Sequence, residues 1–551
     1  MTDHNANDNH TYFDLGHWQR SVETDSAEAQ SWFNRGLNWL YGFNHEEAVY
    51  CFEQAVAADD RCAMGHWGIA YAVGPNYNNA WDGFSPEDRE ACLIAAHGAI
   101  ERGLAVVEDP LERMLLEALQ AWYPATPDTE DFGPYNDAYV DALRPVYQAH
   151  NTDLDVTSLF AEALMGRTPW ALWDLPFGQP AEGASTVEAR MVLEQAFEAS
   201  TLAWEHPGLL HMYIHLMEMS PTPELALPHG DRLVTLVPDS GHLVHMATHI
   251  DVLCGDYQNV IYRNHQAALV DQAFTDLRGP NNFYTVYRIH NVHFEAYGAM
   301  FIAQKETALA AADVLRELLP EPVVAFMPDF FEAFWGVKSH VQVRFGLWQE
   351  ILEEPLPENA ELFSFTTALQ RYSRVVALAN LGRHDEAADE LQLFFEAQAA
   401  VQDTRYMFNN SAAEVLNIAA QMAQGELHYK AGETETGFGH LRQAAHLSDN
   451  LVYDEPWGWM QPPRHALAAL LMDQGRYDEA EELYRADLGL SNQLPRSCQH
   501  PANVWALHGL HECLTRRGEA DEVRHIKRQL DMVLARADVV VGSSCYCRAA
   551  L

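Results

Sequence analysis

A recurring arrangement of small and large residues constrains the fold of this 551-residue chain more than any other feature. Within residues 32–60, six such residues fall at positions 4, 8, 11, 20, 24 and 27 of a 34-residue unit: Trp32, Gly36, Trp39, Ala48, Phe52 and Ala55. Small residues at these positions let two helices of a hairpin approach closely, and large residues fill the space between them. The pattern predicts stacked hairpins, because one hairpin cannot bury its apolar face alone.

The same pattern returns near the C-terminus at Leu467, Ala468, Leu471, Gly475, Ala480 and Tyr484. A looser copy follows at Trp505, Gly509 and Gly518, and the segment ALANLGRHDEAADEL, residues 377–391, has the same helix–turn–helix character. Alternating β-branched runs joined by tight turns are almost absent. We therefore expect an all-α solenoid of roughly seven to ten tetratricopeptide-like (TPR-like) hairpins, wound as a right-handed superhelix.

The chain shows no sharp domain boundary, so its organisation follows the repeats. We expect a loose polar tail over residues 1–25, TPR-like hairpins over 26–150, and histidine-rich central hairpins over 151–303. Further TPR-like hairpins are expected over 304–536, followed by a Cys-x-Cys tail over 537–551.

Composition narrows the classes of partner. With 34 basic and 79 acidic residues, the formal net charge is −45, which repels phosphate backbones and anionic lipid. We therefore expect no nucleic-acid or membrane partner. The N-terminal residues lack the pattern of a signal peptide, and no apolar run is long enough to span a bilayer, so we expect a cytoplasmic protein. The sequence carries no indication of an oligomeric state.

Histidines concentrate in the middle of the chain, and the whole chain has 27 of them. Residues 206–218 read HPGLLHMYIHLME, so His211, His215 and Glu218 share one face of a helix. Residues 241–251 read GHLVHMATHID, which places His242, His245 and His249 on one face as well. His245 and His249 each follow their counterparts in the first helix by 34 residues, so equivalent positions of two successive hairpins carry the pair.

A third helix and a preceding one add candidates. His290 and His293 are three residues apart, and Glu162 lies in the segment LFAEALM. Packed helices lie roughly 8–10 Å apart, a gap that a metal about 2.0–2.1 Å from each imidazole nitrogen can bridge. The histidines predict a transition-metal site with His211, His215, His245 and His249 as core ligands and His242, His290 and His293 as further ligands. Two alternatives stay open: a hydrogen-bonded polar core, and a histidine-lined groove for an anionic or peptide ligand.

The mixture of histidine and carboxylate indicates a catalytic metal more than a structural one. Imidazole ligands suit zinc, copper or iron, and Glu218 or Glu162 is the candidate base for a metal-bound water. His206 is a further possible ligand. Asn291 and Tyr284 are candidates for orienting the metal-binding side chains without contacting the metal themselves.

The C-terminal segment SCYCR contains Cys545 and Cys547, separated by one residue. Two thiolates at this spacing can hold one soft metal or form a redox pair. The third interpretation is an exposed tail with two incidental cysteines.

Several segments together resemble a bacterial TPR family related to tetratricopeptide repeat protein 38 of animals. They include HPGLLHMYIHLME, GHLVHMATHI, HNVHF, LFAEALMGRTPWALWD, RHALAALLMDQGRYDEAEELYRADL and the terminal SCYCR, and they extend from about residue 30 to the end. The resemblance implies an α-helical repeat fold and the same histidine and glutamate positions, but no particular activity. The segment HMATHI departs from the family, which tends to have Pro-Ser before the last histidine; all three histidines are kept.

The leading hypothesis is therefore a TPR-fold metalloprotein, hydrolytic or oxidative, that accepts a small molecule or peptide in its concave groove. One alternative is a non-catalytic scaffold for protein–protein interaction. Such grooves usually clamp peptides with Asn, Arg and Lys, whereas this chain has only four lysines, Lys305, Lys338, Lys430 and Lys527. A second alternative is metal storage or delivery, which would involve Cys545 and Cys547.

Overall fold

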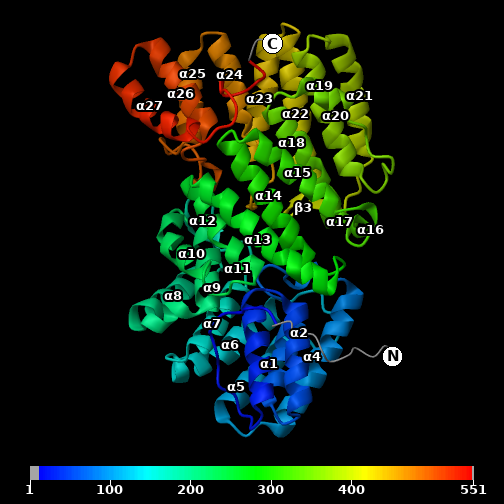
Figure 1. Cartoon of the computed structure of the whole chain (residues 1–551), viewed down its shortest axis with the longest axis vertical. Helices are drawn as coiled ribbons and strands as arrows, with labels where there is room; N and C mark the ends of the chain where they lie inside the picture. Colours follow the sequence, from blue (N-terminus) through cyan, green and yellow to red (C-terminus); the bar gives the residue numbers. More distant parts are fainter. Residues whose placement is uncertain (1–11, 549–551) are drawn as a thin grey trace. The chain divides into compact units, whose positions relative to one another are not determined.

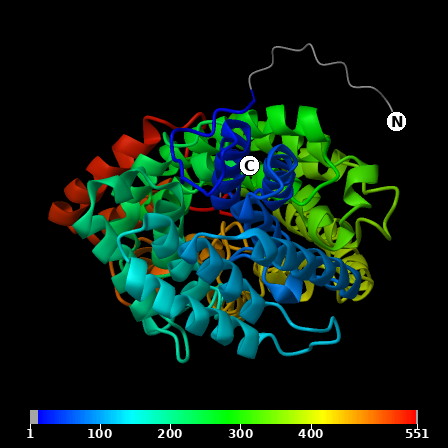
Figure 2. The ribbon, with the colours of Figure 1, turned by 90° about the horizontal axis from the view of Figure 1, so that it is seen from below.

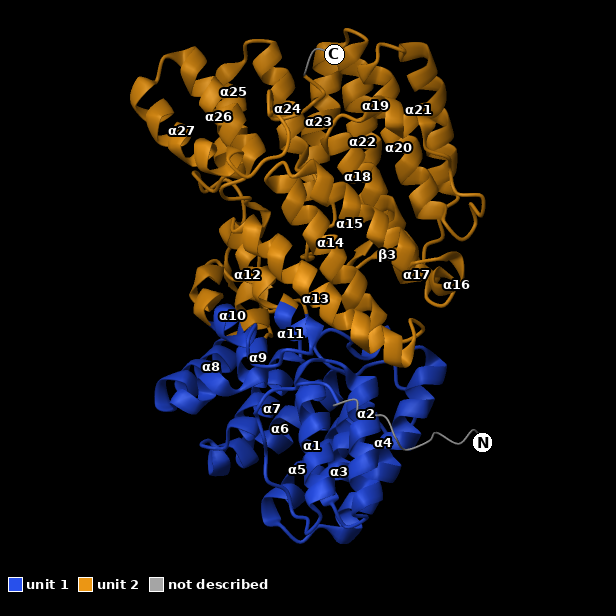
Figure 3. Ribbon diagram, in the orientation of Figure 1, with its two compact units in different colours: residues 1–169, 187–213, 229–244 blue, residues 170–186, 214–228, 245–551 orange. Residues whose placement is uncertain are grey.

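The computed structural model describes residues 12–548, and nearly all of this part of the chain forms helices joined by turns (Figure 1). The predicted all-α fold of helical hairpins is confirmed. The chain folds into two compact units (Figure 3). Unit 1 comprises residues 1–169, 187–213 and 229–244, and unit 2 comprises residues 170–186, 214–228 and 245–551. Each unit is described by itself.

Unit 1 contains the first helices of the chain: α1 (Ala27–Tyr41), α2 (His45–Ala58), α3 (Ala63–Ala72), α4 (Pro86–Val106), α5 (Pro110–Trp122), α6 (Gly133–His150), α7 (Leu154–Met165) and α8 (Thr186–Ala199). The 3-10 helix η1 (Trp81–Gly83) lies between α3 and α4, and η2 (Thr201–Glu205) follows α8. The division between the units falls within α9 (Pro207–Glu218), α10 (Leu227–Leu233) and α11 (Gly241–His245).

Unit 2 contains sixteen further α-helices: α12 (Ala247–Cys254), α13 (Tyr257–Arg278), α14 (Thr285–Phe301), α15 (Lys305–Leu318), α16 (Glu321–Val324), α17 (Pro328–Phe331), α18 (Val337–Arg344), α19 (Trp348–Glu353), α20 (Ser364–Asn380), α21 (His384–Ala399), α22 (Ala412–Lys430), α23 (Thr434–Asp449), α24 (Pro463–Asp473), α25 (Tyr477–Asp487), α26 (Val504–Arg517) and α27 (Ala520–Leu534). The 3-10 helices are η3 (Pro223–Ala226), η4 (Glu332–Gly336) and η5 (Arg496–Cys498). Two antiparallel pairs of two-residue strands complete it: β1 (Trp173–Asp174) with β2 (Gln179–Pro180), and β3 (Tyr406–Met407) with β4 (Asn410–Ser411).

Consecutive helices such as α20 and α21, or α22 and α23, lie side by side as hairpins (Figures 1 and 2). The first hairpin shows how the repeat residues act. The ring of Phe52 on α2 packs against Gly36 on α1 and against Gly68 on α3. A Cβ atom at Gly36 would lie 2.7 Å from ring carbons of Phe52, closer than van der Waals contact allows. The glycine is therefore the residue that lets these helices approach.

Residues 12–25 differ from the expected loose tail. Leu15 is buried, the indole N–H of Trp18 donates to Asp155 at 2.9 Å, and Arg20 pairs with Asp153 at 2.8 Å. Both carboxylates lie at the start of α7, so this segment packs as extended chain against the rest of unit 1. The polar composition of this segment did not predict the packing, because only a few of the segment's large side chains make the contacts. The remainder of the expected tail, residues 1–11, lies outside the described residues.

Among the helices of residues 12–548, none combines the length and the apolar character that crossing a bilayer requires.

The contact at Gly36 gives a stability prediction. We expect Gly36→Ala to lower the free energy of unfolding by about 1–3 kcal/mol, because the new methyl group overpacks against Phe52. Thermal unfolding followed by circular dichroism measures this change. Gly98→Ala on α4 is the matched control, since its Cβ would approach only the flexible end of Arg102, and its melting temperature should not fall. Equal melting temperatures for the two variants would contradict the packing argument.

Candidate metal centre

Four segments of unit 2 bring a histidine cluster together. Its members are His215, His245, His249, His290, Glu218 and Glu455, and all six are buried. His215 and Glu218 lie on the last turn of α9, His290 lies on α14, and His245 and His249 flank the start of α12. Helix α12 ends at Gly255, which adopts the left-handed conformation with φ 79° and lets the chain turn into α13. The rings of His245, the last residue of α11, and His249 on α12 both lie next to the ring of His290 on α14, with ring centres 4.6 and 5.8 Å away.

Each of three imidazoles in the cluster is anchored through Nδ1. His215 Nδ1 lies 3.0 Å from Glu218 Oε1, and His249 Nδ1 lies 2.7 Å from Glu218 Oε2. His245 Nδ1 lies 2.5 Å from Oδ1 of Asn264 on α13. Because carboxylate and amide oxygens accept hydrogen bonds, each Nδ1 donates, which places the ring lone pair on Nε2. A partner on Nδ1 is also the usual arrangement behind a metal-ligating histidine.

The anchored rings converge through Nε2. The Nε2 atoms of His245 and His249 are 2.7 Å apart, and the ring centres of His245 and His290 are 4.6 Å apart. Two lone pairs cannot face each other at that distance unless a cation lies between them, either a proton or a metal ion.

The Nδ1 edge of the His249 ring faces two carboxyl groups, those of Glu218 and Glu455. Its Nδ1 also contacts Glu455, whose carboxylate accepts a hydrogen bond from the Tyr453 hydroxyl. Burial lowers the pKa of the His249 imidazolium, but Glu455 and Glu218 outweigh burial and raise that pKa to about 10. Burial and the neighbouring Glu455 carboxylate raise the pKa of Glu218 well above its usual range. Without a metal, a proton therefore occupies His249.

His290 is the fourth imidazole of the cluster, and its Nδ1 is not anchored. Its Nδ1 is buried and has no hydrogen-bond partner among the described residues. Burial, followed by the neighbouring His245 and His249 rings, lowers the pKa of His290 well below its ordinary value. His290 is therefore neutral, which is the form that ligates metals.

Two triads within the histidine cluster have the spacing of a metal site. One nitrogen each from His245, His249 and His290 lie within 4.8 Å of one another, and so do ligand atoms of His215, Glu218 and His249. A metal ion at the first triad would be held by one nitrogen from each of His245, His249 and His290.

In unit 1, two more predicted ligands meet. His211 Nε2 lies 3.2 Å from His242 Nε2, and His211 Nδ1 donates to the carbonyl oxygen of Tyr41 at 2.7 Å. Both rings pack against Phe43. This pair repeats the arrangement of His245 and His249, with a backbone carbonyl in place of the carboxylate.

Three other predicted residues have contacts away from the cluster. His206 accepts the backbone N–H of Leu209 at the start of α9 and lies 3.3 Å from Asp155. Asn291 donates to Asp271 at 2.8 Å, and Tyr284 packs against Phe274.

His293 is also set apart from the cluster. It belongs to no group of metal-ligand spacing among the described residues. Its ring lies between Phe334 and Phe408, and burial lowers its pKa to about 3.

Glu162, the second candidate base, lies in unit 1 on α7. Its Oε2 accepts a hydrogen bond of 2.9 Å from the Tyr71 hydroxyl. Burial raises the pKa of Glu162 to about 7. No described histidine shares its surroundings at metal-ligand spacing.

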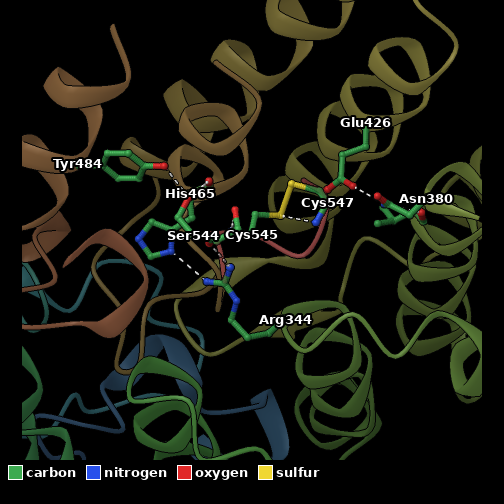
Figure 4. Close-up of a disulfide and its surroundings, with 10 residues drawn as sticks. Arg344, Asn380, Glu426, His465, Tyr484, Ser544, Cys545 and Cys547 are labelled. Atoms are coloured by element: carbon green, nitrogen blue, oxygen red, sulfur yellow. Dashed lines mark hydrogen bonds between the residues drawn. A yellow bond between two sulfur atoms is a disulfide. The ribbon is translucent and has the colours of Figure 1, made fainter. Parts of the chain in front are cut away.

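The C-terminal cysteines are joined as a disulfide in unit 2 (Figure 4). Cys547 is buried, and a Glu426 carboxylate oxygen lies within 4.8 Å of both sulfur atoms. The preceding Ser544 is held by three residues, Arg344, His465 and Tyr484. The segment is therefore not an exposed tail; residues 549–551 lie outside the described part.

Sequence reasoning missed three residues of the site. Asn264, Glu455 and Tyr453 contact the cluster from α13 and from the loop before α24. Asn264 lies in an ordinary amphipathic helix, and the two loop residues follow Glu218 by more than 200 positions in the chain, so no local pattern marked them.

No protein-family model matches the chain, and no curated protein matches it in sequence. Solved structures with a similar trace include the human IFIT1 dimer with m7Gppp-AAAA, at 9% identity and a TM-score of 0.32, covering 93% of this chain and 92% of that one. The APC/C hetero-tetramer Cut9–Hcn1 matches at 12% identity and a TM-score of 0.28, over 93% and 96% of the two chains. At these values, the ligands and partners of those proteins say nothing about this chain.

The raised pKa of Glu162 gives a pH prediction. In the folded chain this carboxyl holds its proton up to about pH 7, whereas in the unfolded chain it ionises near its ordinary pKa of 4.5. Its contribution to stability is therefore full below pH 4.5 and is lost as the pH rises through 7, by about 3 kcal/mol in all. We expect Glu162→Gln to gain thermal stability relative to the wild type between pH 5 and pH 8. If the melting temperatures of Glu162→Gln and the wild type differed by the same amount at every pH, the raised pKa of Glu162 would be contradicted.

Proposed function

We propose that unit 2 binds one divalent transition-metal ion through ring nitrogens of His245, His249 and His290. The observation that carries the proposal is the direction of the imidazoles: the Nδ1 atoms of His245 and His249 donate to fixed acceptors, and their Nε2 atoms face each other at 2.7 Å. Asn264 and Glu218 are positioning residues in this arrangement, since they fix ring orientation and tautomer.

A purely structural polar core is the less favourable alternative. Such a core stabilises a protein only when each buried polar atom has a partner, because an unmet donor or acceptor costs about 1–3 kcal/mol. The cluster instead leaves buried Nδ1 of His290 without a partner among the described residues. A metal bound by these imidazoles would offset the free-energy cost of burying them together.

The donor set favours zinc, copper or iron, and a site of three imidazoles resembles a catalytic site more than a closed one. Such a metal supplies Lewis acidity or redox chemistry, and we propose a hydrolytic or oxidative enzyme acting on a small molecule or peptide. Glu218 was a candidate base, but both of its oxygens accept from histidine Nδ1 atoms. We therefore assign it to positioning. Without metal binding, the helical-hairpin fold itself fits a scaffold or binding role.

Metal content is the direct test. We expect tag-free wild-type protein, purified without chelating resin, to contain close to one transition-metal ion per chain by elemental mass spectrometry. The double variant His245→Ala/His249→Ala should lose that ion and keep its helical circular dichroism, because two ligands are removed from a site that the fold does not need.

The control for this test is His265→Gln on α13, since His265 is half-exposed and pairs with Glu295 at 3.2 Å, away from the cluster. It should retain the metal. The metal proposal would be overturned if wild-type protein is metal-free and also fails to bind added zinc, copper, iron and nickel. The scaffold or binding role would then be the better-supported function.

The positioning role of Glu218 is tested separately. We expect Glu218→Gln to weaken metal binding by about 10–100-fold, because one carboxamide cannot accept from both His215 and His249. Competition with a chromophoric chelator measures the affinity. Glu306→Gln, an exposed position on α15, is the matched change of charge and should leave the affinity unaltered. Equal metal affinity for the two variants would show that Glu218 does not orient the metal-binding histidines.

A further inference from the structure

The disulfide between Cys545 and Cys547 in unit 2 is a chemical group that the metal site does not use (Figure 4). The six other cysteines of the described chain are free. A disulfide stabilises a fold mainly by closing a loop in the unfolded chain, and this contribution shrinks as the loop shortens. The bond between Cys545 and Cys547 spans one intervening residue, Tyr546, so it adds little stability. A role in chemistry at the sulfur atoms explains the pair better.

We propose that Cys545, Cys547 and Glu426 form a thiol–disulfide exchange site whose substrate is the disulfide of a small thiol compound. The structure holds the oxidised form of this site, and a dithiol reductant supplies the electrons that open it. The proposal uses none of the histidines of the metal centre, so either proposal can fail without the other.

The two sulfur atoms have different surroundings. Cys547 is fully buried, whereas Cys545 is only partly buried. The backbone N–H of Cys547 donates to Cys545 Sγ at 3.1 Å. A hydrogen bond to the charged form of a group favours that form, so this N–H stabilises a thiolate at Cys545. These differences assign attack on the substrate to Cys545, and they leave Cys547 to resolve the mixed disulfide.

Glu426 on α22 is the third member of the site. Its side chain is buried and points toward the two cysteines (Figure 4), with a carboxylate oxygen within 4.8 Å of both sulfur atoms. Asn380 on α20 donates to Oε2 at 2.8 Å and fixes the carboxyl group. Burial raises the pKa of Glu426 to about 7, because it outweighs the Asn380 hydrogen bond and the charges of Lys430 and Arg344. Such a group can accept and release a proton near neutral pH.

The segment that carries the cysteines is tied down on both sides of the pair. Arg344 on α18 donates to the carbonyl oxygen of Ser544 at 2.9 Å, and the Ser544 hydroxyl donates to the carbonyl oxygen of His465 at 3.0 Å. On the other side, Arg548 pairs with Glu512 on α26 at 2.6 Å. These contacts do not involve the sulfur atoms, so they keep both thiols beside Glu426 when the disulfide opens.

The exchange reaction has two steps. The reduced pair first loses a proton to water, and the Cys545 thiolate attacks one sulfur of the substrate disulfide. The substrate S–S bond breaks, a mixed disulfide forms on Cys545, and the first substrate thiolate leaves and takes up a proton. Glu426 then removes the proton from Cys547, whose thiolate attacks Cys545 Sγ, restores the disulfide and releases the second thiolate to be protonated. Two electrons pass from the cysteine pair to the substrate, and the dithiol returns them.

The experiment compares the full-length protein with a synthetic peptide of residues 542–548, GSSCYCR, which has both cysteines but lacks Glu426. Both are reduced with dithiothreitol, freed of it, and mixed with bis(2-hydroxyethyl) disulfide, a small neutral probe. Acid-quenched samples are analysed by mass spectrometry, and peptide mapping locates the oxidised cysteines. We expect the protein to form the Cys545–Cys547 bond at least about tenfold faster than the peptide.

Two cysteine variants separate the steps. Cys547→Ser lacks the resolving thiol, so we expect it to accumulate one mercaptoethanol adduct per chain on Cys545. Cys545→Ser should form no adduct at Cys547, because that side chain is fully buried.

A third variant tests Glu426. Glu426→Gln keeps an acceptor for Asn380 but cannot take a proton, so the adduct on Cys545 should form at the wild-type rate and persist about tenfold longer or more. A merely structural change would not act on the second step alone. Glu396→Gln on α21 removes an exposed charge and should leave both steps unaltered.

Three results would overturn the proposal. They are a wild-type rate no greater than that of the peptide, an adduct on Cys547 in place of Cys545, and a second step that keeps its rate in Glu426→Gln. The comparison with the peptide uses only the wild-type chain, so it does not depend on the folding of a variant.

Discussion

Close approach of paired helices is the constraint on which the rest of this structure depends. A ring such as Phe52 reaches across the first hairpin only because Gly36 and Gly68 leave room for it. At the other end of the chain, Gly509 makes the same room for Tyr484. When helices pack this tightly, a side chain on an inner face is buried whatever its chemistry. Polar residues on those faces must then find partners inside the protein.

The histidine cluster of unit 2 shows how that requirement is met. Burying imidazoles and carboxylates without compensation is costly, and Glu218 offsets part of the cost by accepting from His215 and His249 together. Asn264 does the same for His245. These bonds also remove rotational freedom from the rings. The network that stabilises the interior is thus the one that orients nitrogens toward a common point, so burial and preorganisation have one cause.

The sequence predicted the helical hairpins well, because small and large residues recur at fixed offsets and each offset has a local physical meaning. It also predicted His245, His249 and His290 as ligands from their spacing along helices, and the fold brings these three rings close together. It could not identify Asn264 or Glu455, because helical periodicity describes a single helix and these residues come from elsewhere. It placed His293 with the ligands on spacing alone, whereas the fold encloses that ring between Phe334 and Phe408.

Glu218 and Glu162 show why residue type alone does not decide function. Both are glutamates on the inner face of a helix, and burial raises the pKa of both carboxyl groups. Glu218 meets two imidazole N–H donors, so its oxygens are committed to holding rings. Glu162 meets a single phenol and otherwise aromatic surface, so its charge is left without a counter-ion in the described chain. A carboxylate with both oxygens committed orients its neighbours, whereas Glu162 orients none of the histidines. The difference arises from Tyr71 and His249, which lie 91 and 31 residues from their respective partners.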